Sequence, residues 1–208
     1  MPPMTIRSAL AALLLCLTPL SAHAGAVLSD ADRADLTKAE AYFNQIVTLK
    51  ARFLQVSPAG DYTEGTVFIQ RPGLMRLEYD PPVPLLLVAD GTFFIYYDKE
   101  LDQTTHLFLN DTPAGIMLKE KLSFFDGEVT VTNVARKNGV IEISLTQTEN
   151  PAEGELTLVF SNSPYEFKQW RVLDAQGEVT TVSLFEATEG VDLPPGLFRL
   201  SRTKDSGN

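Results

Sequence analysis

The chain has 208 residues, with 17 lysine and arginine side chains against 27 aspartate and glutamate side chains, for a formal charge of -10. This length can bury a sizeable core, and the acidic excess removes the main electrostatic term for phosphate binding, which excludes a nucleic-acid partner. The single cysteine, Cys16, lies near the N-terminus, in a segment that we expect to be removed. Disulfide scaffolds, thiolate metal sites and cysteine nucleophiles are therefore excluded as well.

Residues 1–24 have the pattern of a secretory signal peptide. Arg7 provides the positive start, an apolar run follows over residues 9–17, and Ala22-His23-Ala24 has small residues where signal peptidase cleaves. The apolar run is shorter than the roughly 20 residues that a membrane-spanning helix needs. We predict export with cleavage after Ala24, which leaves a single mature domain over residues 25–208.

Cys16 does not fit the signal of a lipoprotein. Leu15 precedes it where a small residue is expected, and Cys16 lies inside the apolar run rather than after it. An acylated, membrane-anchored N-terminus is therefore not predicted.

The first predicted element of the mature chain is a helix from Ser29 to about Gln55. Ser29 is a favourable N-cap, and Asp30 and Asp32 lie in the first turn, where the helix dipole favours negative charge. Apolar residues then recur at three- and four-residue steps as far as Phe53, so one face should pack on another element.

Beyond this helix the hydrophobic period changes from 3.6 to 2, and turn residues interrupt it about every ten residues. Asp90-Gly91 and Asn138-Gly139 lie between apolar runs and favour hairpin turns with positive φ. About eleven short strands with hairpin connections predict a mainly β protein with a strongly curved or barrel-like antiparallel sheet. The predicted strands are 64–70, 75–79, 85–89, 92–97, 103–109, 128–136, 140–147, 154–161, 166–174, 178–187 and 196–201.

One segment interrupts the strand series. Residues 112–118 place Pro113 at a helix start and continue with apolar residues, which predicts a short helix. Together with the N-terminal helix it could cover an open side of the sheet.

The early strands are apolar on both faces. Residues 84–89, 92–97 and 67–69 do not alternate as a sheet with one face in water should. One face can meet helices, and the other is predicted to be a barrel interior, either filled by side chains or left partly open for an apolar ligand.

Residue types that carry catalysis or bind metals are scarce. After the signal segment one histidine remains, His106, and it lies in a strand-like context. The sequence has no nucleophile elbow, no zinc-protease motif and no phosphate-binding glycine loop. We predict no catalytic residue, no metal and no cofactor. A hydrolase that uses two carboxylates stays as the enzyme alternative, because the separation of two acids is a property of the folded chain.

Four segments occur in a characteristic order and spacing: Phe53-Leu54-Gln55, residues 65–79, Val88-Ala89-Asp90-Gly91 and residues 97–104. In this order they resemble the periplasmic outer-membrane lipoprotein carrier family, LolA. The most specific part is a glycine followed by Arg-Pro and then by Asp-Gly. The similarity continues through Thr112-Pro113 and covers essentially the whole mature chain.

This resemblance implies an incompletely closed antiparallel barrel with a helical lid around a hydrophobic cavity that shields acyl chains. It also implies a monomeric periplasmic chaperone, not an enzyme. Such a carrier takes acylated lipoproteins from an inner-membrane ATP-driven transporter and passes them to an outer-membrane receptor.

The resemblance also assigns individual residues. Arg71 matches the family's arginine, which contacts the lid backbone in the closed form and whose loss impairs cargo release. Met75 matches a large apolar position near the mouth, and methionine suits a deformable lipid site. The candidate lipid-binding and lid-contact residues are Arg71, Met75, Phe68, Leu77, Phe53 and Phe94.

Other proteins with a related fold remain as alternatives. One is a periplasmic protein that binds another lipid or acyl ligand, and another is a sensor of mislocalised lipoproteins. The outer-membrane receptor has the same fold but is acylated at a cysteine, and the context of Cys16 argues against it.

Overall fold

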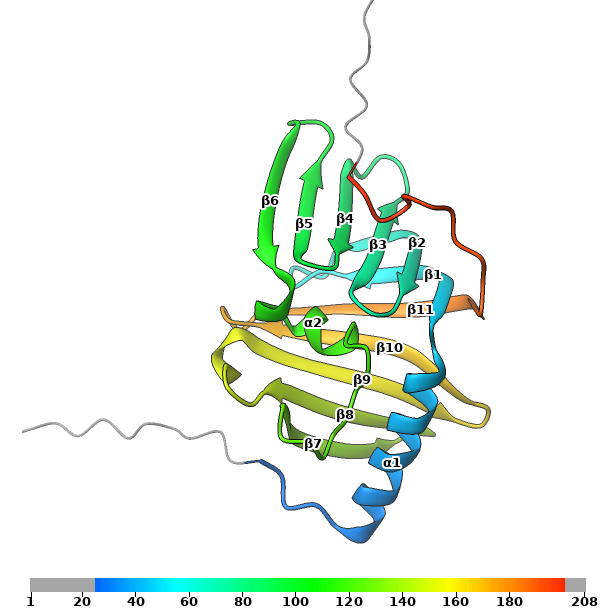
Figure 1. Ribbon diagram of the computed structural model, residues 1–208, viewed down its shortest axis with the longest axis vertical. Coiled ribbons are helices and arrows are strands. Elements are labelled where there is room, and N and C mark those ends of the chain that lie inside the picture. Colours follow the sequence, from blue (N-terminus) through cyan, green and yellow to red (C-terminus); the bar gives the residue numbers. More distant parts are fainter. Residues whose placement is uncertain (1–24, 201–208) are drawn as a thin grey trace, which may run out of the picture.

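A computed structural model describes residues 25–200 and contains one antiparallel sheet of eleven strands (Figure 1). The predicted signal peptide, residues 1–24, lies outside the described residues. The helices are α1 (Asp30–Gln45) and α2 (Pro113–Met117), and two 3-10 turns are η1 (Leu109–Asp111) and η2 (Pro151–Glu153). The strands are β1 (Thr48–Val56), β2 (Tyr62–Gln70), β3 (Leu74–Tyr79), β4 (Leu85–Asp90), β5 (Phe93–Asp98), β6 (Gln103–Phe108), β7 (Val129–Lys137), β8 (Val140–Gln147), β9 (Gly154–Asn162), β10 (Tyr165–Asp174) and β11 (Val179–Glu189).

The sheet is curved but not closed. Its order is β6-β5-β4-β3-β2-β1-β11-β10-β9-β8-β7. Consecutive strands pair within each of two halves, β1–β6 and β7–β11, and the pairing of β1 with β11 joins these halves. Within residues 25–200, β6 and β7 are the two edges and do not pair with each other. η1 and α2 follow β6 and cross this opening (Figure 1). The predicted fold class is confirmed.

α1 begins where the sequence predicted it. The Ser29 hydroxyl accepts a hydrogen bond from the Asp32 backbone N–H at 3.2 Å, and the Asp32 carboxylate accepts one from the Ser29 N–H at 2.9 Å. This reciprocal capping box satisfies two backbone donors that a helix start would otherwise leave unpaired.

The predicted end of this helix, near Gln55, is wrong: α1 ends at Gln45 and β1 begins at Thr48. Leu49 and Phe53 are both buried and lie four residues apart, a spacing that fits about one helical turn as well as two full two-residue periods of a strand. Ala51 is buried between them, and this alternation is a strand pattern.

The ten predicted strands from 64–70 to 178–187 correspond to β2 to β11. The predicted strand at 196–201 is wrong: residues 196–200 form no strand, and residue 201 lies outside the described residues. Residues 190–200 instead cross the outer face of the β2–β4 half without regular structure (Figure 1). Arg76 on β3 donates to the Leu197 carbonyl at 3.1 Å, and Phe198 is buried. This segment contributes to the second apolar face of the early strands.

Both helices lie on the concave side of the sheet. Leu36, Ala39 and Phe43 of α1 belong to the main core cluster, where the Phe43 ring meets Phe167 of β10 edge to face. α2 packs on β8 and β9. Neither helix in the described part of the chain combines the length and apolar composition needed to cross a membrane.

Gly65 of β2 is needed by the packing inside the sheet. A Cβ atom at this position would lie 2.1 Å from the Glu78 carbonyl oxygen and 2.7 Å from the Phe53 ring. The Phe53 ring in turn packs edge to face on Tyr79 at 5.3 Å. The Glu78 carbonyl and the Phe53 ring therefore explain why the family-like segment 65–79 begins with a glycine.

Candidate ligand cavity and its lid

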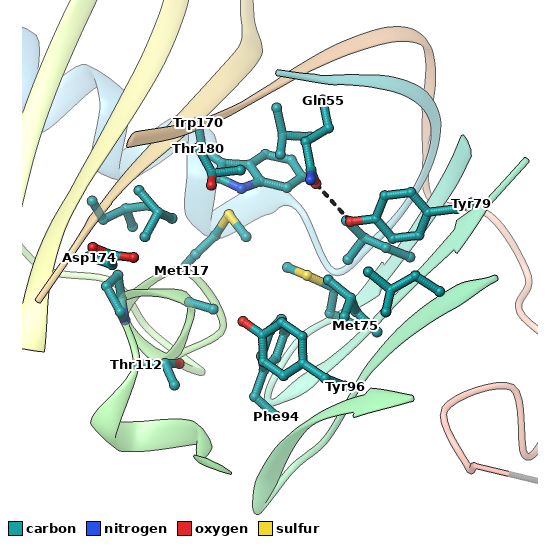
Figure 2. A pocket seen from close by; sticks show the side chains of 18 residues that line it. Gln55, Met75, Tyr79, Phe94, Tyr96, Thr112, Met117, Trp170, Asp174 and Thr180 are labelled. Carbon is teal, nitrogen blue, oxygen red and sulfur yellow. Dashed lines mark hydrogen bonds between the residues drawn. The ribbon is translucent and has the colours of Figure 1, made fainter. Parts of the chain in front are cut away.

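A cavity of about 240 Å³ lies between the concave face of the sheet and α2 (Figure 2). Its wall is mainly apolar, because alternate residues of each strand point inward. The apolar lining includes Met75, Leu77, Leu87, Phe94, Met117 and Leu156. Methionines lie on both the sheet side and the α2 side, and their flexible side chains suit a wall that must adapt to a ligand.

One end of the cavity carries polar side chains. Gln55, Tyr79, Tyr96, Asp174 and Thr180 line it there (Figure 2). The Tyr79 hydroxyl donates to the Gln55 side-chain carbonyl at 2.7 Å. Burial raises the pKa of Tyr79, and it also raises the pKa of Tyr96, with a smaller contribution from the negative charge of Asp174. Both phenols therefore stay neutral at physiological pH.

The cavity is covered by residues 109–124, which we call the lid segment; it contains η1 and α2, and Thr112, Pro113, Ala114 and Met117 line the cavity. Arg71, in the turn between β2 and β3, is 7% exposed and binds this segment. Its Nε donates to the Lys119 carbonyl at 2.9 Å, its Nη1 donates to the Phe43 carbonyl at 2.7 Å, and its Nη2 donates to Asn44 Oδ1 at 3.1 Å. One guanidinium thus joins the sheet, the end of α1 and the lid segment.

The Arg71 guanidinium stays charged in this place. Burial lowers its pKa to about 10, which is still well above neutral pH. It also lies over the Phe43 ring, 4.9 Å from the ring centroid. Carbonyl acceptors and a ring face are suitable partners for a buried cation that forms no ion pair with a carboxylate of residues 25–200.

Further side chains that sequence reasoning missed hold the lid segment. Asn44 Nδ2 donates to the Leu122 carbonyl at 2.7 Å, and the Leu122 N–H donates back to Asn44 Oδ1 at 2.9 Å. Glu40 accepts from the Phe124 N–H at 3.0 Å, and Gln147 of β8 donates to the Asn110 carbonyl at 2.6 Å. Their hydrogen-bond partners lie far away along the chain, so no local pattern identifies these residues.

The structure separates the candidate residues into four groups, and Phe68 alone forms the fourth. Met75, Leu77 and Phe94 line the cavity, with Met75 near the Arg71 turn rather than at the polar end. Arg71 lies outside the cavity and binds the lid segment. Phe53 is fully buried behind Tyr79.

Phe68 lies on the outer face of the sheet. Its neighbours Val67 and Ile69 are buried in the core, and its ring faces outward within 5.7 Å of the Lys50 ammonium. The alternation of β2 therefore places Phe68 away from the cavity, so it is not part of the binding proposal below.

The described residues offer little for metal binding or hydrolysis. Within residues 25–200 no group of three or more histidine, cysteine, aspartate or glutamate side chains could hold a metal ion. Asp174 is the single carboxylate that lines the cavity. The acid pair that a carboxylate hydrolase would need is therefore not found among the cavity residues.

A family model described as "Outer membrane lipoprotein carrier protein LolA" matches residues 44–201. The chain is similar to an outer-membrane lipoprotein carrier protein of Pseudomonas fluorescens, with 27% identity over 200 residues that cover 91% of this chain and 91% of that protein. It is 22% identical over 184 residues to an uncharacterized protein of Rickettsia prowazekii, with 88% of this chain and 82% of that protein covered. Among solved structures, a LolA superfamily protein of Nitrosomonas europaea aligns with a TM-score of 0.43 and 10% identity, over 78% of this chain and 96% of that chain.

Proposed function

Because the chain belongs to the outer-membrane lipoprotein carrier (LolA) family, whose members are periplasmic carriers and not enzymes, we propose that it is a periplasmic chaperone for lipoproteins. It holds the acyl chains in the cavity, receives its cargo from an inner-membrane ATP-driven transporter and delivers it to an outer-membrane receptor. The observation that supports this most directly is an apolar cavity under a lid segment that Arg71 fastens to the sheet and to α1.

Loading requires the lid segment to move. The cavity of about 240 Å³ is smaller than the roughly 300 Å³ at the lower end of pockets for drug-sized ligands. Several long acyl chains therefore do not fit beneath the closed lid. Opening breaks the hydrogen bonds of Arg71, Asn44 and Gln147 to the segment.

This opening cost is what makes carriage reversible. Each buried methylene contributes about 0.8 kcal/mol, so a fully preformed cavity would bind long chains too tightly to release them. The free energy that the closed lid loses on opening offsets part of that gain. The apparent affinity is then set by the difference between the open and closed states.

The decisive experiment is to isolate the exported protein from its native periplasm and identify its bound molecules by mass spectrometry. A triacylated polypeptide supports the carrier. A free lipid in its place would refute cargo transport and favour a related lipid-binding protein. The intact mass of the same sample tests export and cleavage, because we expect the chain to begin at Gly25.

A further inference from the structure

The polar side chains that the strands contribute to the cavity lie at one end of the barrel. The register pairs Val56 at the end of β1 with Thr181 near the start of β11, and Leu173 at the end of β10 with Val179. β3 and β5 run in the same direction as β1, so their last residues lie at this end too. The inward-facing side chains nearest to this end, which we call the polar rim, are Gln55, Tyr79, Tyr96, Asp174 and Thr180.

Along β3 and β5 the inward-facing residues change from apolar to polar, whereas on β4 Leu85 and Leu87 keep the wall apolar. On β3 the order from the Arg71 turn towards this end is Met75, Leu77 and Tyr79, and on β5 Phe94 is followed by Tyr96. The cavity is therefore a hydrocarbon environment with a cluster of hydrogen-bonding groups at one end. Such a gradient matches a ligand with an apolar body and a polar head.

Two donors of the polar rim are free to bind a ligand. The Tyr96 hydroxyl points into the cavity (Figure 2), and no described residue forms a hydrogen bond with it. Gln55 uses its carbonyl oxygen to accept from Tyr79, which orients the amide and leaves its NH₂ group as a donor. Tyr96 is 38% exposed, so water solvates its hydroxyl in the free protein, and a ligand that excludes this water must offer an acceptor in its place.

Asp174 provides an acceptor. Its Oδ1 accepts from the backbone N–H groups of Gln176 and Glu178 at 2.9 Å each, which fixes the turn between β10 and β11. Its second oxygen takes no part in these bonds and belongs to the side chain that lines the cavity. The rim thus combines neutral O–H and N–H donors with one negatively charged acceptor.

We propose that the polar rim is a subsite for the linkage region of an acylated ligand, where fatty chains are joined through ester and amide groups. Tyr96 Oη and Gln55 Nε2 donate to carbonyl oxygens, and Asp174 accepts from an amide N–H. The inference rests on the proposed function and specifies the chemistry that the cavity recognises. Because Asp174 repels a carboxylate, the same rim disfavours a free fatty acid.

Two substitutions test this subsite with little change in shape. Tyr96→Phe removes one hydroxyl. Asp174→Asn keeps the oxygen that accepts from the turn and replaces the second oxygen with a donor. Tyr97→Phe is the matched control, because Tyr97 lies on the same strand and faces outward, where its hydroxyl donates to Asp102 at 3.1 Å.

Binding is measured by displacement of the neutral fluorophore N-phenyl-1-naphthylamine by a synthetic triacylated cysteinyl peptide or by palmitate. We expect Tyr96→Phe to weaken binding of the triacylated peptide by about threefold to tenfold. Asp174→Asn should weaken binding of the peptide and strengthen binding of palmitate, since it removes a negative charge. Tyr97→Phe should leave both affinities unchanged.

The outcomes separate the subsite from the carrier function. If the wild-type protein binds the peptide and both rim variants bind it equally well, the subsite is refuted and the carrier function stands. A shift of the peptide and palmitate affinities in the same direction in Asp174→Asn would refute the role of its charge. If the wild-type protein does not bind the peptide at all, both the proposed function and the subsite are refuted. Thermal unfolding of each variant shows whether the turn and the fold are intact.

Discussion

Replacing Arg71 with leucine tests whether the lid segment controls binding. The substitution removes the donors that bind the Lys119 carbonyl, the Phe43 carbonyl and Asn44 Oδ1, and it leaves these acceptors in a buried place. The open form loses much less, because its lid no longer contacts Arg71. The variant therefore destabilises the closed form selectively.

The size of the effect follows from these contacts. Leaving a buried acceptor without its donor costs about 1–3 kcal/mol, and Arg71→Leu does this to more than one acceptor. Part of this is recovered, because burial of the charge was itself unfavourable, as the lowered pKa of Arg71 indicates. We expect a loss of about 3 kcal/mol in the free energy of unfolding, or roughly 6–12 °C in Tm for a chain of this size.

The same 3 kcal/mol should appear in ligand binding with the opposite sign. A closed form that is less stable competes less with the loaded form, so the affinity for the triacylated peptide should rise by up to about 100-fold. Slower dissociation should account for most of the change. Urea unfolding gives the stability, and stopped-flow displacement of a labelled triacylated peptide gives the dissociation rate.

Two controls make this test specific. Arg71→Lys keeps a positive charge but loses the planar fork of donors, so it should fall between wild type and Arg71→Leu. Arg76→Leu removes an arginine from the outer face of β3, and we expect it to leave ligand affinity unchanged. If Arg71→Leu lowers stability while affinity and dissociation rate stay at wild-type values, the lid segment does not offset binding and the mechanism is refuted.

Three further predictions concern the core, the cavity and the helix cap. Gly65→Ala should cost roughly 3 kcal/mol or more in thermal unfolding, because its Cβ would lie 2.1 Å from the Glu78 carbonyl; a loss below about 1 kcal/mol would contradict this contact. Met117→Trp should fill the cavity and prevent direct binding of both the fluorophore and a labelled triacylated peptide, at a stability cost of no more than about 3 kcal/mol; unchanged peptide binding would mean that the acyl chains bind elsewhere. Asp32 has a pKa of about 2 instead of 3.8, because it accepts hydrogen bonds from Ser29 and Arg136. The contribution of this carboxylate to the free energy of unfolding is therefore complete above its unfolded pKa and is lost as the pH falls through about 2. Urea unfolding should show Asp32→Asn less stable than wild type near neutral pH but not near pH 2. A difference in stability that does not change with pH would contradict this assignment.

Much of the fold could be predicted because its signals are local. The cap at Ser29, the hairpin at Asn138-Gly139 and the alternation of β2 to β11 depend on neighbours a few residues apart. The end of α1 could not be predicted in the same way, since the spacing of Leu49 and Phe53 satisfies a helix and a strand equally well. The tertiary structure decides for a strand, because β1 pairs with both β2 and β11 and the Ala51 side chain is buried.

The candidate site could be predicted only in part, because a local pattern does not decide which side of the sheet a residue faces. An apolar residue in a strand predicts burial, but the strand's place in the sheet decides whether it faces the cavity, as Phe94 does, or the outside, as Phe68 does.

The sequence by itself determined where most strands and turns form, because hydrophobic period and turn chemistry act over a few residues. The tertiary structure alone decided which ends of the strands meet. Pairing of β1 with β11 brings Gln55 and Asp174 to one rim, and the path of the lid segment brings the Lys119 carbonyl to Arg71. These contacts join residues far apart in the chain, and the burial of one shared core selects them.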